Sequence, residues 1–306
     1  MTAVGIAKEL TMDMTNLRGS IVALVTPFKE DQSVDFDALE RLVDFHLANG
    51  TDGILVLGTT GESSTMTDEE DFAVAKCVID RVAGRVPVIG GSGSNATAES
   101  LNKSLGLQKL GIDGLLLITP YYNKSNEEGI YRHFTTVLDA ADVPCILYNI
   151  PGRTGCSISE RNVARLSKHP NAWGIKEASG NISYATTVAR YLSDFRMLSG
   201  NDDMVVPILS LGGSGVISVW ADIRPQVVHD MCANWFAGNT QAALATQLEN
   251  LELIHSLFCE VNPIPVKAAL AKMGMIGETY RSPLYTISNA GRERLYAAMR
   301  EVGLID

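Results

Sequence analysis

Eight short apolar runs recur along the first two thirds of this 306-residue chain, and they constrain its fold more than any other feature. Their starts lie 32, 33, 28, 30, 28, 24 and 19 residues apart. Near-continuous apolar runs of this length are typical of parallel strands that are buried on both faces. The runs are Ile21–Val25, Gly53–Leu57, Val86–Gly90, Gly114–Ile118, Pro144–Tyr148, Ala172–Lys176, Arg196–Gly200 and Gly215–Val219.

The segments between the runs have helical periodicity. Phe36, Leu39, Leu42, Val43 and Leu47 fall on one face of a helix, for example. Eight strand–helix units predict an α/β fold, a (β/α)₈ TIM barrel. An open doubly wound sheet is the competing fold, but it is disfavoured because no Gly-x-Gly-x-x-Gly follows the first run.

From Arg224 onward the pattern changes to mostly helical. We therefore expect an N-terminal extension over residues 1–16, the catalytic barrel over 17–224, and a C-terminal helical domain over 225–306. The expected C-terminal helices are Val227–Phe236, Thr240–Cys259, Val266–Lys272 and Ser288–Val302.

Composition excludes several classes of protein. The net charge of -10, without a Lys/Arg-rich stretch, argues against a nucleic-acid partner. No apolar run approaches the ~20 residues of a membrane span, and residues 1–15 do not have the pattern of a secretory signal. The five cysteines are scattered and odd in number, which favours reduced thiols in the cytoplasm.

Lys176 is the most informative single residue. It ends a run that reads as a buried strand, where lost hydration disfavours the charged amine and lowers its pKa. A partly neutral amine near pH 7 attacks carbonyls and forms a Schiff base. The alternative for Lys176 alone is a strand-end lysine whose ammonium group reaches water.

Other polar residues also follow the predicted strands, at the end where barrel enzymes carry their active sites. Tyr148 and Arg153 follow the fifth strand, Thr59 and Thr60 the second, and Tyr122 the fourth. Thr59 or Thr60 would hold a substrate carboxylate, although an ordinary helix-capping turn explains the same residues. The convergence predicts an enzyme that condenses carbonyl compounds.

Metal chemistry and serine hydrolysis have no support in the sequence. The five histidines have no metal-ligand spacing, no Cys-x-x-Cys occurs, and there is no Gly-x-Ser-x-Gly. We expect neither a metal nor a cofactor.

Four motifs together resemble the dihydrodipicolinate synthases, also called 4-hydroxy-tetrahydrodipicolinate synthases, of the pyruvate-dependent class I aldolase superfamily. The resemblance runs from about Leu17 to the C-terminus, and residues 1–13 look like an extension beyond the usual start. The motifs are Gly58-Thr59-Thr60-Gly61-Glu62, Tyr148-Asn149-Ile150-Pro151-Gly152-Arg153-Thr154, Gly174-Ile175-Lys176-Glu177-Ala178-Ser179 and Gly215-Val216-Ile217-Ser218.

The resemblance implies a lyase that condenses pyruvate with L-aspartate 4-semialdehyde, the first committed step of lysine and diaminopimelate biosynthesis. Lys176 would form the pyruvate imine, and Thr60 and the Ile217 backbone would contact the pyruvate. Arg153 would orient the carboxylate of the semialdehyde. The implied proton relay consists of Thr59, Tyr148 and Tyr122, with Tyr122 coming from a neighbouring subunit of a homotetramer built as a dimer of dimers.

Two rivals remain. An N-acetylneuraminate lyase or another keto-acid aldolase would keep the lysine and the tyrosine, but sugar-cleaving relatives lack the arginine at position 153. A guanidinium matches a carboxylate bidentately, which a polyol does not require. A catalytically silent binding protein on the same barrel is the rival from another class.

The resemblance also implies an L-lysine effector site at the tight-dimer interface. This chain departs from lysine-sensitive relatives at Asp68 and Asp71, where those carry histidines. The alternative is that the serines and the asparagine of this set only cap helices. The matching residues are Ser63, Ser64, Asn95, Glu99 and Tyr121.

Overall fold

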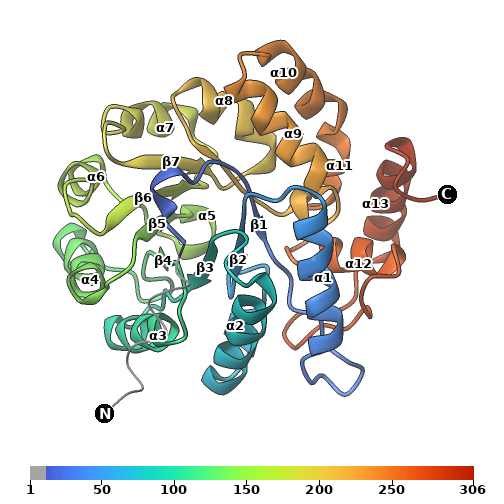
Figure 1. Cartoon of the computed structure of the whole chain (residues 1–306), viewed down its shortest axis with the longest axis horizontal. Coiled ribbons are helices and arrows are strands. Elements are labelled where there is room, and N and C mark those ends of the chain that lie inside the picture. Colours follow the sequence, from blue (N-terminus) through green and yellow to red (C-terminus); the bar gives the residue numbers. More distant parts are fainter. Residues whose placement is uncertain (1–11) are drawn as a thin grey trace.

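A computed structural model describes residues 12–306 of the chain, and its centre is a closed barrel of eight parallel strands. Each strand pairs with its neighbours in sequence, and β8 pairs with β1 to close the ring (Figure 1). The predicted (β/α)₈ barrel is confirmed, with strand ends displaced by at most two residues. The strands are β1 (Gly19–Ala23), β2 (Gly53–Val56), β3 (Val88–Gly91), β4 (Gly114–Ile118), β5 (Cys145–Asn149), β6 (Ala172–Glu177), β7 (Arg196–Ser199) and β8 (Gly215–Ser218).

Helices surround the strands, as the periodicity predicted (Figure 1). The α2 helix begins in a capping box, because the Thr67 hydroxyl accepts from the Glu70 N–H while the Glu70 carboxylate accepts from the Thr67 N–H. The helices that follow the strands are α1 (Phe36–Ala48), α2 (Asp68–Val82), α3 (Thr97–Lys109), α4 (Glu127–Ala140), α5 (Pro151–Thr154), α6 (Glu160–Leu166), α7 (Ile182–Ala189), α8 (Val205–Ser210) and α9 (Pro225–Phe236), the last being the first helix of the expected C-terminal helical region.

Short 3₁₀ turns occur at the barrel ends, namely η2 (Met14–Asn16), η3 (Ser63–Thr65), η4 (Asp202–Met204) and η5 (Trp220–Asp222). Met14 is buried and its carbonyl accepts a hydrogen bond from the Trp173 indole at 3.0 Å. Met14 therefore packs against the barrel, whereas most of the extension predicted over residues 1–16 lies outside the described residues.

The C-terminal helices gather on one side of the ring (Figure 1). They are α10 (Thr240–Glu249), α11 (Leu251–Ser256), α12 (Ile264–Lys272) and α13 (Asn289–Glu301). The single helix predicted over Thr240–Cys259 is wrong, because Asn250 interrupts it. Its side chain donates to the Thr246 carbonyl and accepts from Arg224 at 2.7 Å, so it competes with the helical backbone.

Two apolar clusters hold the fold together. One fills the space between strands and helices, and the other fills the barrel interior. The interior cluster contains Ile21, Leu55, Ile89, Leu116, Ile146, Leu198 and Ile217. Strand side chains alternate between the two clusters, so one residue in two points into the barrel. Tyr148 belongs to the interior set, which brings it to the axis at the carboxyl end.

Candidate active site

Tyr148 and Lys176 are register partners on β5 and β6, at the carboxyl end of the barrel. The Nζ atom of Lys176 lies 4.4 Å from the centroid of the Tyr148 ring, and both side chains are buried. The aliphatic part of the Lys176 side chain packs against Gly200. A Cβ at position 200 would lie 3.1 Å from the lysine Cε, so a larger residue there would crowd the lysine. The structure thus brings together the two residues that the sequence analysis singled out first.

Burial sets the protonation of this pair. It lowers the pKa of Lys176 to about 7, while the Asp202 carboxylate opposes that shift and the Arg153 charge adds to it. Burial also raises the pKa of Tyr148 to about 12, against the lowering by Arg153 and by a hydrogen bond with Thr59. Near neutral pH the amine is therefore partly free to attack a carbonyl, and the phenol keeps its proton.

Thr60 and Arg153 meet at a residue from outside the barrel strands. Thr60 is buried in the turn after β2, and its hydroxyl oxygen accepts from the side-chain amide of Asn262 at 3.0 Å. Arg153 lies on the short helix α5 and donates from Nη2 to the main-chain oxygen of Asn262 at 3.2 Å. Two candidate carboxylate-binding groups thus face the same side of the site.

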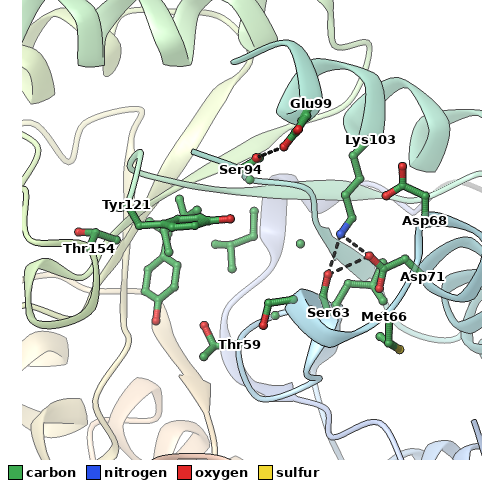
Figure 2. A pocket seen from close by; sticks show the side chains of 18 of the residues that line it. Thr59, Ser63, Met66, Asp68, Asp71, Ser94, Glu99, Lys103, Tyr121 and Thr154 are labelled. Carbon is green, nitrogen blue, oxygen red and sulfur yellow. Dashed lines mark hydrogen bonds and ion pairs between the residues drawn. The ribbon is translucent and has the colours of Figure 1, made fainter. Parts of the chain in front are cut away.

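A cavity of about 590 Å³ opens at this end of the barrel. Seven of the predicted site residues line it, namely Thr59, Ser63, Ser64, Glu99, Tyr121, Tyr148 and Arg153. Figure 2 shows Thr59 and Tyr121 on one side of the cavity and Ser63, Asp71 and Lys103 on the other. The cavity therefore joins Thr59, Tyr148 and Arg153 to part of the candidate effector set.

The remaining predicted residues, Lys176 and Thr60 included, do not line the cavity. Ile217 is buried on β8 in the barrel interior. Tyr122 is 91% exposed, has a positive φ of 67° and does not line the cavity. Asn95 does not line it either, and its main-chain oxygen accepts from Asn123 at 3.0 Å.

A lysine of the chain itself occupies one side of the cavity. The ammonium group of Lys103 donates to the carboxylate of Asp71 and to the Ser63 hydroxyl, the latter at 2.6 Å (Figure 2). Asp71 is buried, which raises its pKa, and Lys103 opposes that rise. Sequence reasoning had identified Asp71 only as a departure from lysine-sensitive relatives and had not paired it with Lys103. The signal that it missed is the position of Lys103 on α3, one turn after Glu99 and so on the same face.

Three further polar residues escaped the sequence analysis. Asp202 is buried and accepts from the N–H groups of Val219 and Trp220 at 3.1 and 2.9 Å, which ties the end of β7 to the end of β8. One residue beyond the Tyr148–Lys176 pair, Asn149 donates to Glu177 at 2.7 Å. The only signal for Asn149 and Glu177 was that each directly follows a candidate residue, and for Asp202 that it lies two residues after the predicted seventh strand.

Within residues 12–306, no group of histidine, cysteine, aspartate and glutamate side chains is arranged to hold a metal ion. No helix in that range is both long and apolar enough to cross a membrane. The arrangement suits imine chemistry, because a partly neutral amine lies beside a protonated phenol, and that phenol lines one cavity with a guanidinium.

Comparisons with known proteins agree with this geometry. The model of the dihydrodipicolinate synthetase family matches residues 16–302. A 4-hydroxy-tetrahydrodipicolinate synthase from Caldicellulosiruptor saccharolyticus is 50% identical over 291 residues, which cover 95% of this chain and 99% of the relative.

Two solved structures are similarly close. One is the chloride-inhibited dihydrodipicolinate synthase from Acinetobacter baumannii in complex with pyruvate, at 41% identity and a TM-score of 0.92, covering 94% of this chain and 100% of that one. The other is the enzyme from Cyanidioschyzon merolae with lysine bound, at 40% identity and a TM-score of 0.92, covering 94% and 99%. With a family match over nearly its whole length and the lysine–tyrosine pair in place, the chain belongs to the dihydrodipicolinate synthetase family.

Proposed function

We propose that this chain is a lyase that condenses pyruvate with L-aspartate 4-semialdehyde to give 4-hydroxy-tetrahydrodipicolinate, the first committed step of lysine and diaminopimelate biosynthesis. The observation that carries the proposal is the buried Lys176 amine, 4.4 Å from the Tyr148 ring and with a pKa lowered to about 7. The name of the Caldicellulosiruptor relative and the pyruvate bound to the Acinetobacter enzyme support the same reaction.

The reaction begins when the neutral amine of Lys176 attacks the keto carbon of pyruvate, and water leaves to form an imine. The imine nitrogen then accepts electron density as the pyruvate methyl group loses a proton, which gives an enamine. The enamine carbon attacks the aldehyde carbon, and a new carbon–carbon bond forms. Finally the amino group of the semialdehyde attacks the imine carbon, the ring closes, and Lys176 leaves. No cofactor is needed in this sequence.

Tyr148, Thr59 and Tyr122 would carry the protons of these steps. The raised pKa of Tyr148 keeps its phenol protonated, so it acts first as a donor to the oxygen that leaves or becomes a hydroxyl. Thr59, whose side chain lowers the pKa of that phenol, would carry the proton onward along the relay. Tyr122 would complete this path from a neighbouring subunit.

The two carboxylates of the reactants would have separate binding groups. Thr60 and the backbone of Ile217 would bind the pyruvate end, close to the amine. Arg153 would bind the carboxylate of the semialdehyde at the mouth, where its guanidinium forms charge-assisted hydrogen bonds. The burial of Thr60 and the exposure of Arg153 support this division.

The assembly proposed is a homotetramer, a dimer of dimers in which Tyr122 crosses an interface. A tyrosine that is 91% exposed in the single chain supports this, because burying a large aromatic ring under a partner subunit is favourable in free energy.

We also propose the division into barrel (17–224) and C-terminal helical domain (225–306). The proposed location is the cytoplasm, where the five unpaired cysteines stay reduced.

L-lysine is the proposed effector, bound by Ser63, Ser64, Asn95, Glu99 and Tyr121. The Cyanidioschyzon relative with lysine bound supports this. Because Lys103 already neutralises Asp71 beside Ser63, a bound lysine has to compete with an ammonium group of the chain itself. We therefore expect weak to moderate inhibition.

The test of the main proposal is a condensation assay on the purified chain. Pyruvate and L-aspartate 4-semialdehyde should be consumed together, and mass spectrometry should find a reduced pyruvyl group on Lys176 after sodium borohydride treatment. An adduct on a different lysine would overturn the mechanism. Faster cleavage of sialic acid than condensation would favour a lyase of the N-acetylneuraminate type, and no adduct at all would favour a silent binding protein.

A further inference from the structure

The segment from Asn262 to Arg281 lies outside the barrel strands but contacts the turn that follows β2. This turn, residues 59–62, contains Thr59 and Thr60 and ends in Glu62. Three contacts join the two segments, although about 200 residues separate them in sequence. They involve Asn262, the helix α12 and the loop after it.

Asn262 connects two groups of the site. Its side-chain amide donates to Thr60 Oγ1 at 3.0 Å, and its main-chain oxygen accepts from Arg153 at 3.2 Å. A hydroxyl oxygen that accepts a hydrogen bond has to direct its own hydrogen elsewhere. Asn262 thus leaves the hydrogen of the Thr60 hydroxyl available as a donor to another group.

Glu62 and Lys267 hold the end of the same turn. Their side chains are 1% and 0% exposed, and Lys267 Nζ lies 2.5 Å from the Glu62 carboxylate. The other carboxylate oxygen accepts from the Arg281 N–H at 3.4 Å, and Nζ of Lys267 lies 4.4 Å from the centroid of the Phe28 ring. Glu62 itself has a positive φ of 54°, a conformation that a non-glycine residue keeps only where its surroundings hold it.

A contribution to folding stability does not by itself account for the buried Glu62–Lys267 ion pair. Two charges removed from water lose as much hydration free energy as their attraction returns, so a well-packed apolar pair is often at least as stable. What an ion pair adds is a defined geometry, because the position of the Glu62 carboxylate fixes the position of the turn backbone. Glu62, the carboxylate-bearing residue of the pair, lies two residues after Thr60, with Gly61 between them.

We infer that Asn262 and the Glu62–Lys267 pair are positioning residues for pyruvate binding, which makes the C-terminal segment part of the catalytic apparatus. The inference rests on the proposed function, since it takes Thr60 as the group that binds the pyruvate carboxylate. None of the three residues touches the reacting atoms. They act through Thr60, so their loss raises the pyruvate concentration needed for half-saturation and leaves the chemical step nearly unchanged.

The experiment compares pyruvate saturation in three variants, each checked for folding by circular dichroism. Asn262→Ala removes the bond to Thr60 and keeps the main-chain oxygen that binds Arg153. The double variant Glu62→Gln/Lys267→Met removes both charges together and leaves neither one buried alone. The control is Glu278→Gln/Arg292→Met, which removes another 2.5 Å ion pair of the C-terminal region that has no hydrogen bond to the turn.

Borohydride trapping on Lys176 at increasing pyruvate gives the readout, together with kcat and KM for both substrates. We expect a ~10-fold rise in half-saturating pyruvate for Asn262→Ala and for the double variant, with kcat within about threefold of the unmodified chain, as the loss of one or two hydrogen bonds implies. KM for the semialdehyde should stay within about twofold in Asn262→Ala, and the control should bind pyruvate normally.

Half-saturation within about twofold of the unmodified chain in Asn262→Ala would overturn the inference. An equal rise in the control would do so too, because it would reveal general loosening of the C-terminal region. If the double variant does not fold, Asn262→Ala decides alone. Failure of the unmodified chain to form the Lys176 adduct would instead overturn the proposed function, so the two failures are distinct.

Discussion

Tyr148 and Lys176 face each other across adjacent strands, as register partners on β5 and β6, with Nζ 4.4 Å from the ring centroid. Register partners in a parallel sheet point to the same face, so both side chains enter the barrel mouth. On the next rung Asn149 and Glu177 are hydrogen-bonded at 2.7 Å, on the opposite face of the sheet. The two rungs together fix how the amine and the phenol lie relative to each other.

Imine formation should depend on pH with a midpoint near 7. Burial lowers the pKa of Lys176 to about 7, so the neutral fraction falls about tenfold for each pH unit below that value. The measurement is the initial rate of pyruvate adduct formation with cyanoborohydride, from pH 5 to pH 9 (about two units on either side). Lys176→Ala should give no adduct, and a midpoint two or more units higher would contradict a desolvated amine.

Arg153→Ala should weaken the use of aspartate semialdehyde far more than it weakens imine formation with pyruvate. Charge-assisted hydrogen bonds contribute roughly 1.5–3 kcal/mol each, so kcat/KM should fall at least ~100-fold. Arg161→Ala is the control, because Arg161 is exposed on α6 and pairs with Glu127. A loss of equal size in pyruvate adduct formation would show that Arg153 does not select the second substrate.

Tyr122 should act across a subunit interface. If so, inactive Tyr122→Phe and inactive Lys176→Ala proteins regain activity when their subunits are mixed, because a hybrid dimer has one site free of both changes. Random assortment restores about a quarter of full activity in a two-fold dimer. Light scattering at the assay concentration should show a tetramer, and a fully active monomer would refute the shared site.

L-lysine should inhibit only partially and without competing with pyruvate. Lys103→Gln removes the ammonium group that donates to Asp71 and Ser63, so inhibition should become stronger by about tenfold. Lys109→Gln, on the same helix but outside the cavity lining, should respond like the unmodified chain. Initial rates that do not change with tens of millimolar lysine in either protein would decide against the effector site.

His46 should make the fold sensitive to acid. It is fully buried, and neither ring nitrogen has a hydrogen-bond partner among residues 12–306. Burial lowers its pKa from 6.5 to about 3. As the pH falls, His46 is therefore protonated in the unfolded chain before it is protonated in the folded chain. This site therefore costs no stability above pH 6.5 and destabilises the fold increasingly between about 6.5 and 3, by ~2 kcal/mol at pH 5.

His46→Leu should remove this loss, and it should stabilise the protein at neutral pH because two unpaired ring nitrogens disappear. Urea unfolding at pH 7.5 and pH 5 (about one unit above and below the ordinary histidine pKa) measures both effects. His255→Leu, at an exposed position on α11, serves as the control. An unchanged difference between the two pH values in His46→Leu would assign the acid sensitivity to other groups.

The fold and the chemistry were largely predictable from local patterns. Apolar runs at regular intervals indicate strands, and polar residues at their carboxyl ends indicate the site, because both signals are confined to a few neighbouring residues. Lys176 and Tyr148 carried enough information in their own strands to predict a buried amine beside a phenol. The interruption at Asn250 was missed because its cause is a hydrogen bond with Arg224, 26 residues away.

Tertiary structure alone decided which residues support that site. The bond from Asn262 to Thr60 spans 202 positions and the Lys267–Glu62 pair spans 205, and no period or motif links residues so far apart. Likewise, only the packing of α3 against α2 placed Lys103 on Asp71. The sequence by itself determined the strands and the reactive groups, because hydrophobic period and residue chemistry are local properties. The burial of side chains, their pairing and the balance of their charges depend on which segments the closed barrel brings together. Only the tertiary structure decides that.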